Sequence, residues 1–311
     1  MPCLSHVIEE EILSGIRLDR YVSENLRLLS RSQIKVRELK AKVNGRDVKL
    51  SRTVKRGDIL ELNWEESAPV NIIPEDIPLE IIYEDERCVV INKAQGMVVH
   101  PGAGNRQGTL ANALCFRRQN REKSNFSTGL RPGIVHRLDK ETSGVIIASY
   151  DEETHAFLSQ QFKARRVRKT YVAVICGVPK EKKGKIETLI ARDQKDRKRF
   201  AVSSSNGKTA LTFYKIIKSW QNHSLVMLRP RTGRTHQLRV HLRHLGHPIL
   251  GDSVYGHEDK YFPDARLMLH SKSLEITLPE KTEAEFFFSP VPERFSEVMQ
   301  KLNKVNGGAN G

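Results

Sequence analysis

The order of apolar runs after residue 78 is the feature that most restricts the fold of this chain. Strand-like runs do not alternate strictly with helical windows, which disfavours a doubly wound parallel sheet. The predicted strands are Leu79–Tyr83, Cys88–Ile91, Val145–Ser149, Tyr171–Cys176, Leu211–Ile217, Ser224–Leu228 and Leu274–Leu278. The predicted helices are Thr109–Gln119, Glu152–Lys163, Thr235–Leu245 and Glu293–Leu302. We therefore predict an α+β domain built on a mixed, mainly antiparallel sheet.

A smaller unit is predicted before this domain. Leu18, Val22 and Leu26 recur every four residues, which indicates a short amphipathic helix. A second helix is predicted from a capping-box pattern at Ser30, and the Asn-Gly pair within Val43–Arg46 predicts a tight hairpin. The predicted boundaries are 1–64 for this unit, 65–78 for an acidic, proline-containing linker, 79–305 for the large domain and 306–311 for a flexible tail.

The charge of the chain predicts a polyanionic partner. The formal net charge is +15, and basic residues concentrate in two stretches. Residues 15–56 contain thirteen Lys and Arg against four acidic residues, and residues 161–200 contain fourteen against four. Two such stretches suggest two contacts with one polyanion, with nucleic acid as the first candidate and an anionic membrane surface as the second. Solvated helix faces are the alternative interpretation of each stretch.

Several classes of protein are disfavoured by the sequence. No stretch approaches the roughly 18 uninterrupted apolar residues that a membrane span needs, and the acidic amino terminus has no apolar signal core. We therefore expect a cytoplasmic protein, and a monomer. The four cysteines lie far apart without zinc-ligand spacing, so we expect neither disulfides nor a zinc site. The histidines between His236 and His247 are interspersed with arginines and joined by no carboxylate or cysteine, so no metal is predicted there either.

Asp139 is the first candidate for chemistry. It lies in the run RPGIVHRLDKETSG, residues 131–144, among cations and between two glycines. Nearby cations keep a carboxylate ionised, which suits a nucleophile or an electrostatic stabiliser better than a general acid. A surface turn with an ordinary salt bridge is the alternative. The HRLD tetrapeptide does not indicate a kinase, because a kinase catalytic loop places the aspartate directly after the arginine.

Three other segments carry candidate residues. In Asn92–Gly102 a strand ends at Lys93, and the glycines that follow let the backbone approach a phosphate or the loop that holds the carboxylate. In Arg165–Tyr171 a basic cluster leads into an aromatic residue, although an edge-strand tyrosine is an equally good interpretation. In Arg231–Leu245 an arginine, Arg234, stands at the start of a predicted helix, where a guanidinium can bind a carboxylate through two hydrogen bonds.

These motifs, taken in order, resemble those of the RluA family of RNA pseudouridine synthases. The HRLD, Lys-x-Tyr and Gly-Arg-Thr-His-Gln motifs follow one another, and Ala94 replaces the proline that usually follows the first lysine. The amino-terminal order RLDRYV…SRSQIKVRELK…VNGRDVKLSRTVKRGDIL resembles the S4 RNA-binding domain over about fifty residues. An S4-like unit on such a domain points to large-subunit ribosomal RNA as substrate, as in the RluD-like branch.

The resemblance implies isomerisation of uridine to pseudouridine without a cofactor or metal. It implies that Asp139 is the nucleophile or the base, that Arg234 pairs with it, and that Tyr171 stacks on a flipped base. The residues expected to bind the substrate are His136, Arg137, Leu238, Arg239 and Lys93. The residues expected to bind RNA elsewhere are Arg17, Arg20, Arg31, Lys35, Arg37, Lys40, Arg165, Arg166 and Arg168.

Two rival functions are considered. A non-catalytic RNA-binding factor, such as a ribosome-assembly protein, would retain the fold for docking, but it need not retain Asp139, Tyr171 and Arg234. An RNA-directed hydrolase would need a second acid or base group near Asp139, and the sequence offers no clear one. The complete set of candidate residues favours the synthase.

Overall fold

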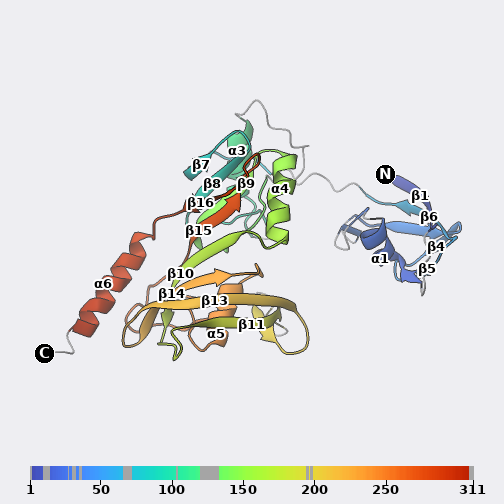
Figure 1. Ribbon diagram of the computed structural model, residues 1–311. Coiled ribbons are helices and arrows are strands. Elements are labelled where there is room, and N and C mark those ends of the chain that lie inside the picture. The colour runs from blue at the N-terminus through green and yellow to red at the C-terminus, as the bar shows by residue number, and fades with distance from the viewer. Residues whose placement is uncertain are drawn as a thin grey trace. The chain divides into compact units, whose positions relative to one another are not determined.

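The structure is a computed structural model in which two compact units, residues 1–71 and 72–311, are distinct (Figure 1). The division falls within the predicted linker. The residues described are 2–9, 15–26, 28–29, 33–34, 37–65, 72–102, 104–119, 133–193, 196 and 199–307.

The amino-terminal unit is a small antiparallel sheet with a short helical segment. The strands run in the order β1 (Cys3–Val7), β6 (Ile59–Asn63), β3 (Lys40–Val43) and β4 (Arg46–Val48), and β2 (Ile16–Arg17) pairs separately with β5 (Thr53–Val54). The predicted hairpin is confirmed, because Asn44 and Gly45 both have positive φ between β3 and β4. The predicted first helix is a single α-helical turn, α1 (Leu18–Arg20), that continues as the π-helical segment η1 (Tyr21–Asn25). Ser30, where the second helix was predicted to begin, lies outside the described residues.

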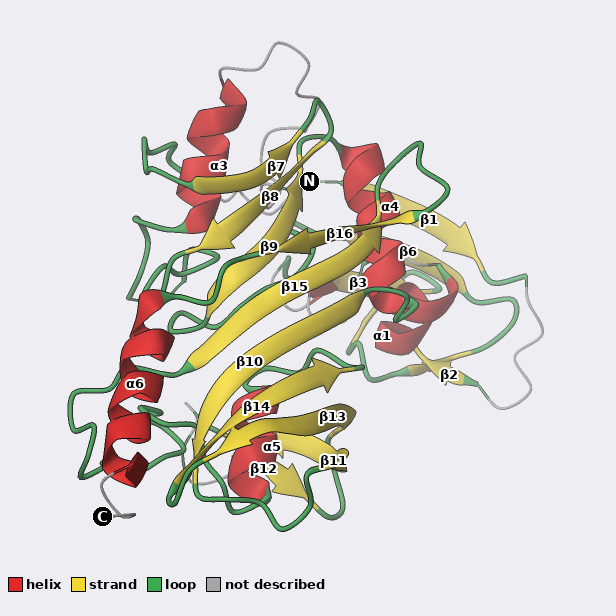
Figure 2. Cartoon of the chain, turned by 60° about the vertical axis from the view of Figure 1, so that its left-hand side comes forward, coloured by secondary structure: helices red, strands yellow, loops and turns green. Residues whose placement is uncertain are grey.

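The carboxy-terminal unit is built on one large sheet, as Figure 2 shows. From edge to edge the strands are β12 (Phe200–Ser203), β11 (Lys183–Arg192), β13 (Lys208–Ser219), β14 (His223–Pro230), β10 (Arg168–Cys176), β15 (Leu269–Thr277), β9 (Ser143–Ser149), β8 (Cys88–Lys93) and β7 (Glu80–Glu84), with β16 (Ala284–Phe288) paired to β15. Among these described strands β9 and β15 alone pair in parallel, over two residue pairs. The predicted mixed, mainly antiparallel sheet is therefore confirmed.

The helices of this unit are α3 (Leu110–Gln119), α4 (Glu152–Lys163), α5 (Gln237–His244) and α6 (Glu293–Gly307). Asp151 begins α4 by accepting a hydrogen bond from the backbone of Thr154 at 2.7 Å. Phe295 and Leu302 of α6 are buried in the main hydrophobic core, so the apolar stripe of this helix packs inward. No helix in the described part of the chain is long and apolar enough to cross a membrane.

Helix α5 lies against one face of the sheet, behind β13 and β14 in Figure 2. The imidazole of His241 hydrogen-bonds to the hydroxyls of Thr188 on β11 and Thr212 on β13, at 3.0 and 2.9 Å. Burial lowers the pKa of His241 to about 4, so the ring is neutral at physiological pH. This histidine therefore fastens the helix to the sheet, and α5 carries its first turn to a fixed place beside the candidate site.

Candidate active site

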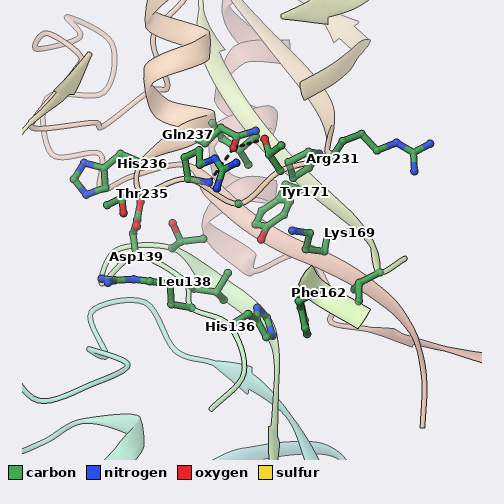
Figure 3. Close-up of a pocket in the computed structure, with 18 of the residues that line it drawn as sticks. His136, Leu138, Asp139, Phe162, Lys169, Tyr171, Arg231, Thr235, His236 and Gln237 are labelled. Atoms are coloured by element: carbon green, nitrogen blue, oxygen red, sulfur yellow. Dashed lines mark hydrogen bonds between the residues drawn. The ribbon is translucent and has the colours of Figure 1, made fainter. Parts of the chain in front are cut away.

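A pocket of about 470 Å³ in the carboxy-terminal unit contains all three predicted catalytic residues and several of the residues predicted to bind substrate (Figure 3). Its walls come from the loop before β9, from the end of α4 with the start of β10, and from the segment between β14 and α5. The predicted site residues that line it are Asp139, Tyr171, Arg234, His136, Arg137, Leu238 and Arg165. Segments far apart in the sequence thus meet around Asp139.

Two glycines shape the loop that carries Asp139. Gly133 and Gly144 have φ of +57° and +111°, a region that disfavours any side chain. A Cβ at Gly133 would lie 1.7 Å from the carbonyl oxygen of Ser149, and one at Gly144 would lie 2.2 Å from that of Ser271. The backbone therefore approaches its neighbours at both ends of the run more closely than any other residue allows. This explains why glycines bracket Asp139.

Lys93 fixes the same loop from inside the protein. Its side chain is fully buried, and its Nζ donates to the carbonyl oxygens of Ala94 and Met97, both at 2.8 Å, and of Lys140 at 3.2 Å. Burial lowers its pKa to about 8, although the nearby negative charge of Asp139 opposes that shift. Lys93, which was predicted to bind the substrate, does not line the pocket, and its ammonium contacts backbone carbonyls of the loop instead.

The cation paired with Asp139 is Arg239. Its Nη1 lies 3.6 Å from Oδ2 of Asp139, while its Nε and Nη2 donate to the two carboxylate oxygens of Asp252 at 2.8 and 2.7 Å. Arg239 is 6% exposed and Asp252 is 2% exposed, so the guanidinium is held rigidly between two carboxylates. Burial alone would lower the pKa of Arg239 and raise that of Asp252. The hydrogen bonds and charges between the two residues outweigh burial, so the pKa of Arg239 is raised and that of Asp252 is lowered. Arg239 was predicted to bind the substrate. It does not line the pocket, and its contacts are with Asp139 and Asp252.

The prediction that Arg234 pairs with Asp139 is also wrong. Helix α5 begins at Gln237, so Arg234 lies in the turn before it, and no ion pair joins Arg234 to Asp139 among the described residues. The Arg234 side chain instead donates from Nε to the carbonyl oxygen of Thr209 at 3.0 Å. Arg234 lines the pocket as part of its wall, five residues before the arginine that contacts the carboxylate.

Tyr171 lies on β10 at the floor of the pocket, where a β-bulge separates it from Thr170. It is 8% exposed, and burial raises the pKa of its hydroxyl to about 12, so the phenol stays neutral at physiological pH. Figure 3 shows its ring and Asp139 in the same pocket. A single group bound in the pocket can therefore contact both the aromatic ring of Tyr171 and the carboxylate of Asp139.

Comparison with known proteins decides the family. A family model described as RNA pseudouridylate synthase matches residues 87–244, which include Asp139, Tyr171 and Arg239. The chain belongs to the RNA pseudouridylate synthase family. It is 43% identical to the ribosomal large subunit pseudouridine synthase D of Borreliella burgdorferi, over 94% of this chain and 91% of that protein. It is 34% identical to the chloroplastic RNA pseudouridine synthase 2 of Oryza sativa, over 98% of this chain and 84% of that protein.

A solved structure agrees with this assignment. Human RNA pseudouridylate synthase domain containing 4 superposes with a TM-score of 0.58 at 28% identity, covering 72% of this chain and 93% of that chain. The large sheet is therefore the pseudouridine synthase fold, and the protein is an isomerase that acts on RNA. This favours the enzyme over the non-catalytic RNA-binding factor considered above.

The inner end of the synthase pocket contains two further polar groups (Figure 3). The ring of His136 stacks on Phe162 with centroids 4.6 Å apart, and its Nε2 accepts a hydrogen bond from the backbone of Ile147 at 3.0 Å. Burial lowers the pKa of His136 to about 3 and that of Lys169 to about 8. Lys169 was part of the Lys-x-Tyr motif but was not predicted as a site residue. Its place in the pocket follows from the strand direction of β10, two residues before Tyr171.

The residues predicted to bind RNA elsewhere are distributed over both units. Of the described ones in the amino-terminal unit, Arg17 and Arg20 are exposed and Arg37 is half-buried, and two are paired locally: Arg17 with Asp19 and Arg20 with Glu24. Lys40 is exposed on β3, whereas Arg31 and Lys35 lie outside the described residues. In the carboxy-terminal unit Arg165, Arg166 and Arg168 are exposed, and Arg168 pairs with Glu275 at 3.0 Å. Among these, Arg165 lines the catalytic pocket.

One cluster of metal-ligand type lies outside the pocket. Cys176, His223 and Asp259 place one ligand atom each within 4.8 Å of one another. The sequence did not indicate this group, because its members are 47 and 36 residues apart. His223 Nε2 and Asp259 Oδ2 are already 2.8 Å apart, and burial raises the pKa of the Cys176 thiol to about 11. The contacts describe a buried hydrogen-bonded pair beside a protonated thiol.

Proposed function

We propose that the synthase isomerises specific uridines of large-subunit ribosomal RNA, with Asp139 as the group that starts the reaction. The observation that carries this proposal is the array Asp139–Arg239–Asp252 at the edge of a pocket floored by Tyr171. The 43% identical relative is named for the large ribosomal subunit, which supports the choice of RNA. The basic charge of the chain supports a large RNA rather than a nucleoside.

The reaction needs one bond broken and one bond formed on the same ribose. The bond from N1 of uracil to C1′ breaks, the base turns within the pocket, and C5 bonds to C1′. C5 then loses one proton and N1 gains one, so the product is an isomer of the substrate. Asp139 acts either by attacking C1′ or by removing a ribose proton to give a glycal, and both routes need an ionised carboxylate. Nothing is oxidised, reduced or hydrolysed, so the proposal requires neither cofactor nor metal.

The surrounding residues divide the remaining tasks. Arg239 orients Asp139 and places a positive charge beside its carboxylate, and Asp252 holds the guanidinium in place through two hydrogen bonds. Tyr171 offers its ring to the flipped uracil, where stacking contributes about 1–3 kcal/mol. Leu238 lines the pocket as an apolar contact for the base, and His136 and Arg137 shape the path of the RNA.

The direct test maps pseudouridines in cellular RNA from strains with and without this gene. Loss of specific pseudouridines from large-subunit ribosomal RNA, restored by the wild-type gene and not by Asp139→Asn, is the expected result. Loss confined to transfer RNA or small-subunit RNA would contradict the proposed substrate while leaving the enzyme class intact. Purified protein acting on a large-subunit RNA transcript distinguishes a direct effect from an indirect one.

We also propose that residues 1–71 form an S4-like RNA clamp. The support is the exposed basic residues of this unit and its own buried core around Leu18, Val22 and Leu60. Removing residues 1–71 should leave weak modification activity, and the slope of log affinity against log salt should become shallower, because fewer phosphate contacts release fewer counterions. An unchanged slope would show that this unit does not touch RNA.

A further inference from the structure

The face of the sheet opposite α5 contains a hollow of about 700 Å³ that the proposed reaction does not use. Thr212 on β13 hydrogen-bonds to Gln237 and His241 of α5, so the next residue, Phe213, points to the other face. Phe213 is 40% exposed, and together with Met227 on β14 it lines the hollow. An aromatic ring on an uncovered sheet face is a platform for a flat apolar group.

The rim of this hollow is cationic. Lys183, Lys185, Lys215 and Arg229 line it, and no carboxylate is among the described residues that do. Lys185 pairs with Glu187 at 3.1 Å. The side chains of Lys183, Lys215 and Arg229 are exposed and have no hydrogen-bond or ion-pair partner in the described part of the chain. Three uncompensated cations around an aromatic floor fit a ligand that is both flat and negatively charged.

A third depression lies between the hollow and the pocket and shares lining residues with both. This depression, of about 540 Å³, shares Phe213 and Arg229 with the hollow and shares Lys169 and Arg231 with the pocket. Phe286 of β16, which is 63% exposed, also lines this depression. A chain that leaves the pocket past Arg231 therefore meets the exposed side chains of Phe286, Arg229 and Phe213. The carboxylate that also lines this depression, Glu275, is paired with Arg168 at 3.0 Å.

We infer that the hollow binds an unpaired nucleotide of the same RNA strand whose uridine occupies the catalytic pocket. The base stacks on Phe213, and flanking phosphates pair with Lys183 and Lys215. A second copy of this chain does not fit as the occupant of the hollow, because two lysine-rich faces repel one another. This inference rests on the proposed function for the identity of the strand, but the binding of an unpaired nucleotide is tested separately.

The test compares two sets of variants that keep the pocket intact. Phe213→Leu removes the aromatic face and keeps an apolar side chain, and the double variant Lys183→Glu with Lys215→Glu reverses the rim charge. Lys180→Glu with Lys304→Glu is the matched control, since it makes the same charge change at exposed lysines that line neither the pocket nor the two depressions. Affinity for a fluorescein-labelled oligouridylate is measured against salt, with inorganic polyphosphate as competitor.

The expected result has three parts. Phe213→Leu weakens oligouridylate binding several-fold at every salt concentration, as loss of one stacked base should. The double variant weakens it about tenfold or more and makes the salt slope shallower by about 1.4, the value for two lost single-strand phosphate contacts. An oligouridylate containing 4-thiouridine crosslinks to the peptide containing Phe213 or Met227 in the wild type and not in Phe213→Leu.

Other results would overturn the inference. Equal losses in the double variant and its control would show that only overall charge matters. Polyphosphate competing as well as oligouridylate, with Phe213→Leu unaffected, would exclude base stacking. RNA binding unchanged in all variants would assign the face to a partner of another class. Failure of the wild type to modify ribosomal RNA would refute the proposed substrate, whereas the oligouridylate crosslink would still decide the binding site.

Discussion

The two sides of the catalytic pocket use positive charge in different ways. The buried side consists of Arg239, Asp252, Lys93 and Tyr171, whose polar groups are held by other parts of the protein. The open side consists of Arg137, Arg165, Arg231 and Arg234, whose side chains have no ion-pair partner among the described residues. Cations on the buried side are fixed in position, and cations on the open side remain available to phosphates.

The contrast assigns chemistry to one side and docking to the other. A guanidinium held by Asp252 cannot follow a moving phosphate, but it can orient Asp139 and keep a positive charge beside its carboxylate through the reaction. A solvent-facing arginine loses little when it changes partner, which suits a surface that must accept a large RNA. Changes on the buried side should therefore lower kcat, and changes on the open side should raise KM.

The largest effect is expected for Asp139→Asn. This change keeps the size of the side chain and removes its charge and nucleophilicity, so turnover should fall by more than about 1000-fold. RNA affinity should stay within about tenfold, or roughly 1.4 kcal/mol, because the open side is untouched. Pseudouridine formation in single-turnover assays and filter binding provide the two readouts. Substantial turnover by this variant would refute the role of Asp139.

The next largest effect separates the two arginines of one motif. Arg239→Lys keeps the charge but cannot bridge both carboxylates, so turnover should fall about 100-fold, and the free energy of unfolding should fall by about 2–4 kcal/mol as Asp252 loses its partner. Arg234→Lys is the matched control and should change kcat by less than about threefold. Circular dichroism and urea unfolding confirm that each variant is folded under assay conditions. A larger loss of turnover in Arg234→Lys than in Arg239→Lys would contradict the assignment of chemistry to the buried side and docking to the open side.

Tyr171→Phe tests whether the buried side contributes a hydroxyl as well as a ring. The aromatic face is kept, so RNA affinity should change by less than about threefold. Turnover should fall by about 100-fold, since a neutral phenol beside Asp139 can pass on its proton while accepting another when C5 or the sugar is deprotonated. Quench-flow measurements of the chemical step test this. Full turnover would limit Tyr171 to stacking.

The smallest predicted effect is a loss of folding stability at acidic pH. The pKa of His136 is about 3 in the folded protein against 6.5 in a model peptide, so the unfolded chain binds more protons between these values and stability falls as pH falls through that window. Between pH 6.5 and 5 the loss due to this residue should be about 1 kcal/mol after allowance for its partial exposure. Urea unfolding of the wild type and of His136→Gln at both pH values measures it. Identical pH dependence in the two proteins would contradict a buried neutral imidazole.

Much of the fold could be predicted, because the sequence patterns that determine these helices and turns lie within the elements themselves. The helix predicted over Thr235–Leu245 matches α5, Gln237–His244, to within two residues, and the Asn-Gly pair predicted the β3–β4 hairpin. Strands β11, β12 and β16 were not predicted. In β11 only Ile186 and Ile190 are buried, so its alternation is masked by lysines and glutamates, and its pairing with β13 determines its conformation.

The ion pair could not be predicted, because it depends on tertiary structure. His236 adopts a left-handed backbone conformation, φ +57°, that delays the start of α5 to Gln237 and takes Arg234 out of the first turn. Its imidazole Nδ1 lies 2.8 Å from the hydroxyl of Tyr255, a partner nineteen residues away. Asp252, which orients Arg239, is likewise distant in sequence. No local pattern distinguishes Arg234 from Arg239.

The short parallel pairing of β9 with β15 is a seam between two halves of the sheet. Asp139 belongs to the half that contains β7, β8 and β9, whereas Tyr171 and Arg239 belong to the half that contains β10 and β14. Neither half contains a working site, so catalytic activity arises only when the seam has closed. Recovery of turnover during refolding should therefore report when this long-range pairing has formed. A side chain at Gly144 should block the pairing, because its Cβ would lie 2.2 Å from the carbonyl oxygen of Ser271.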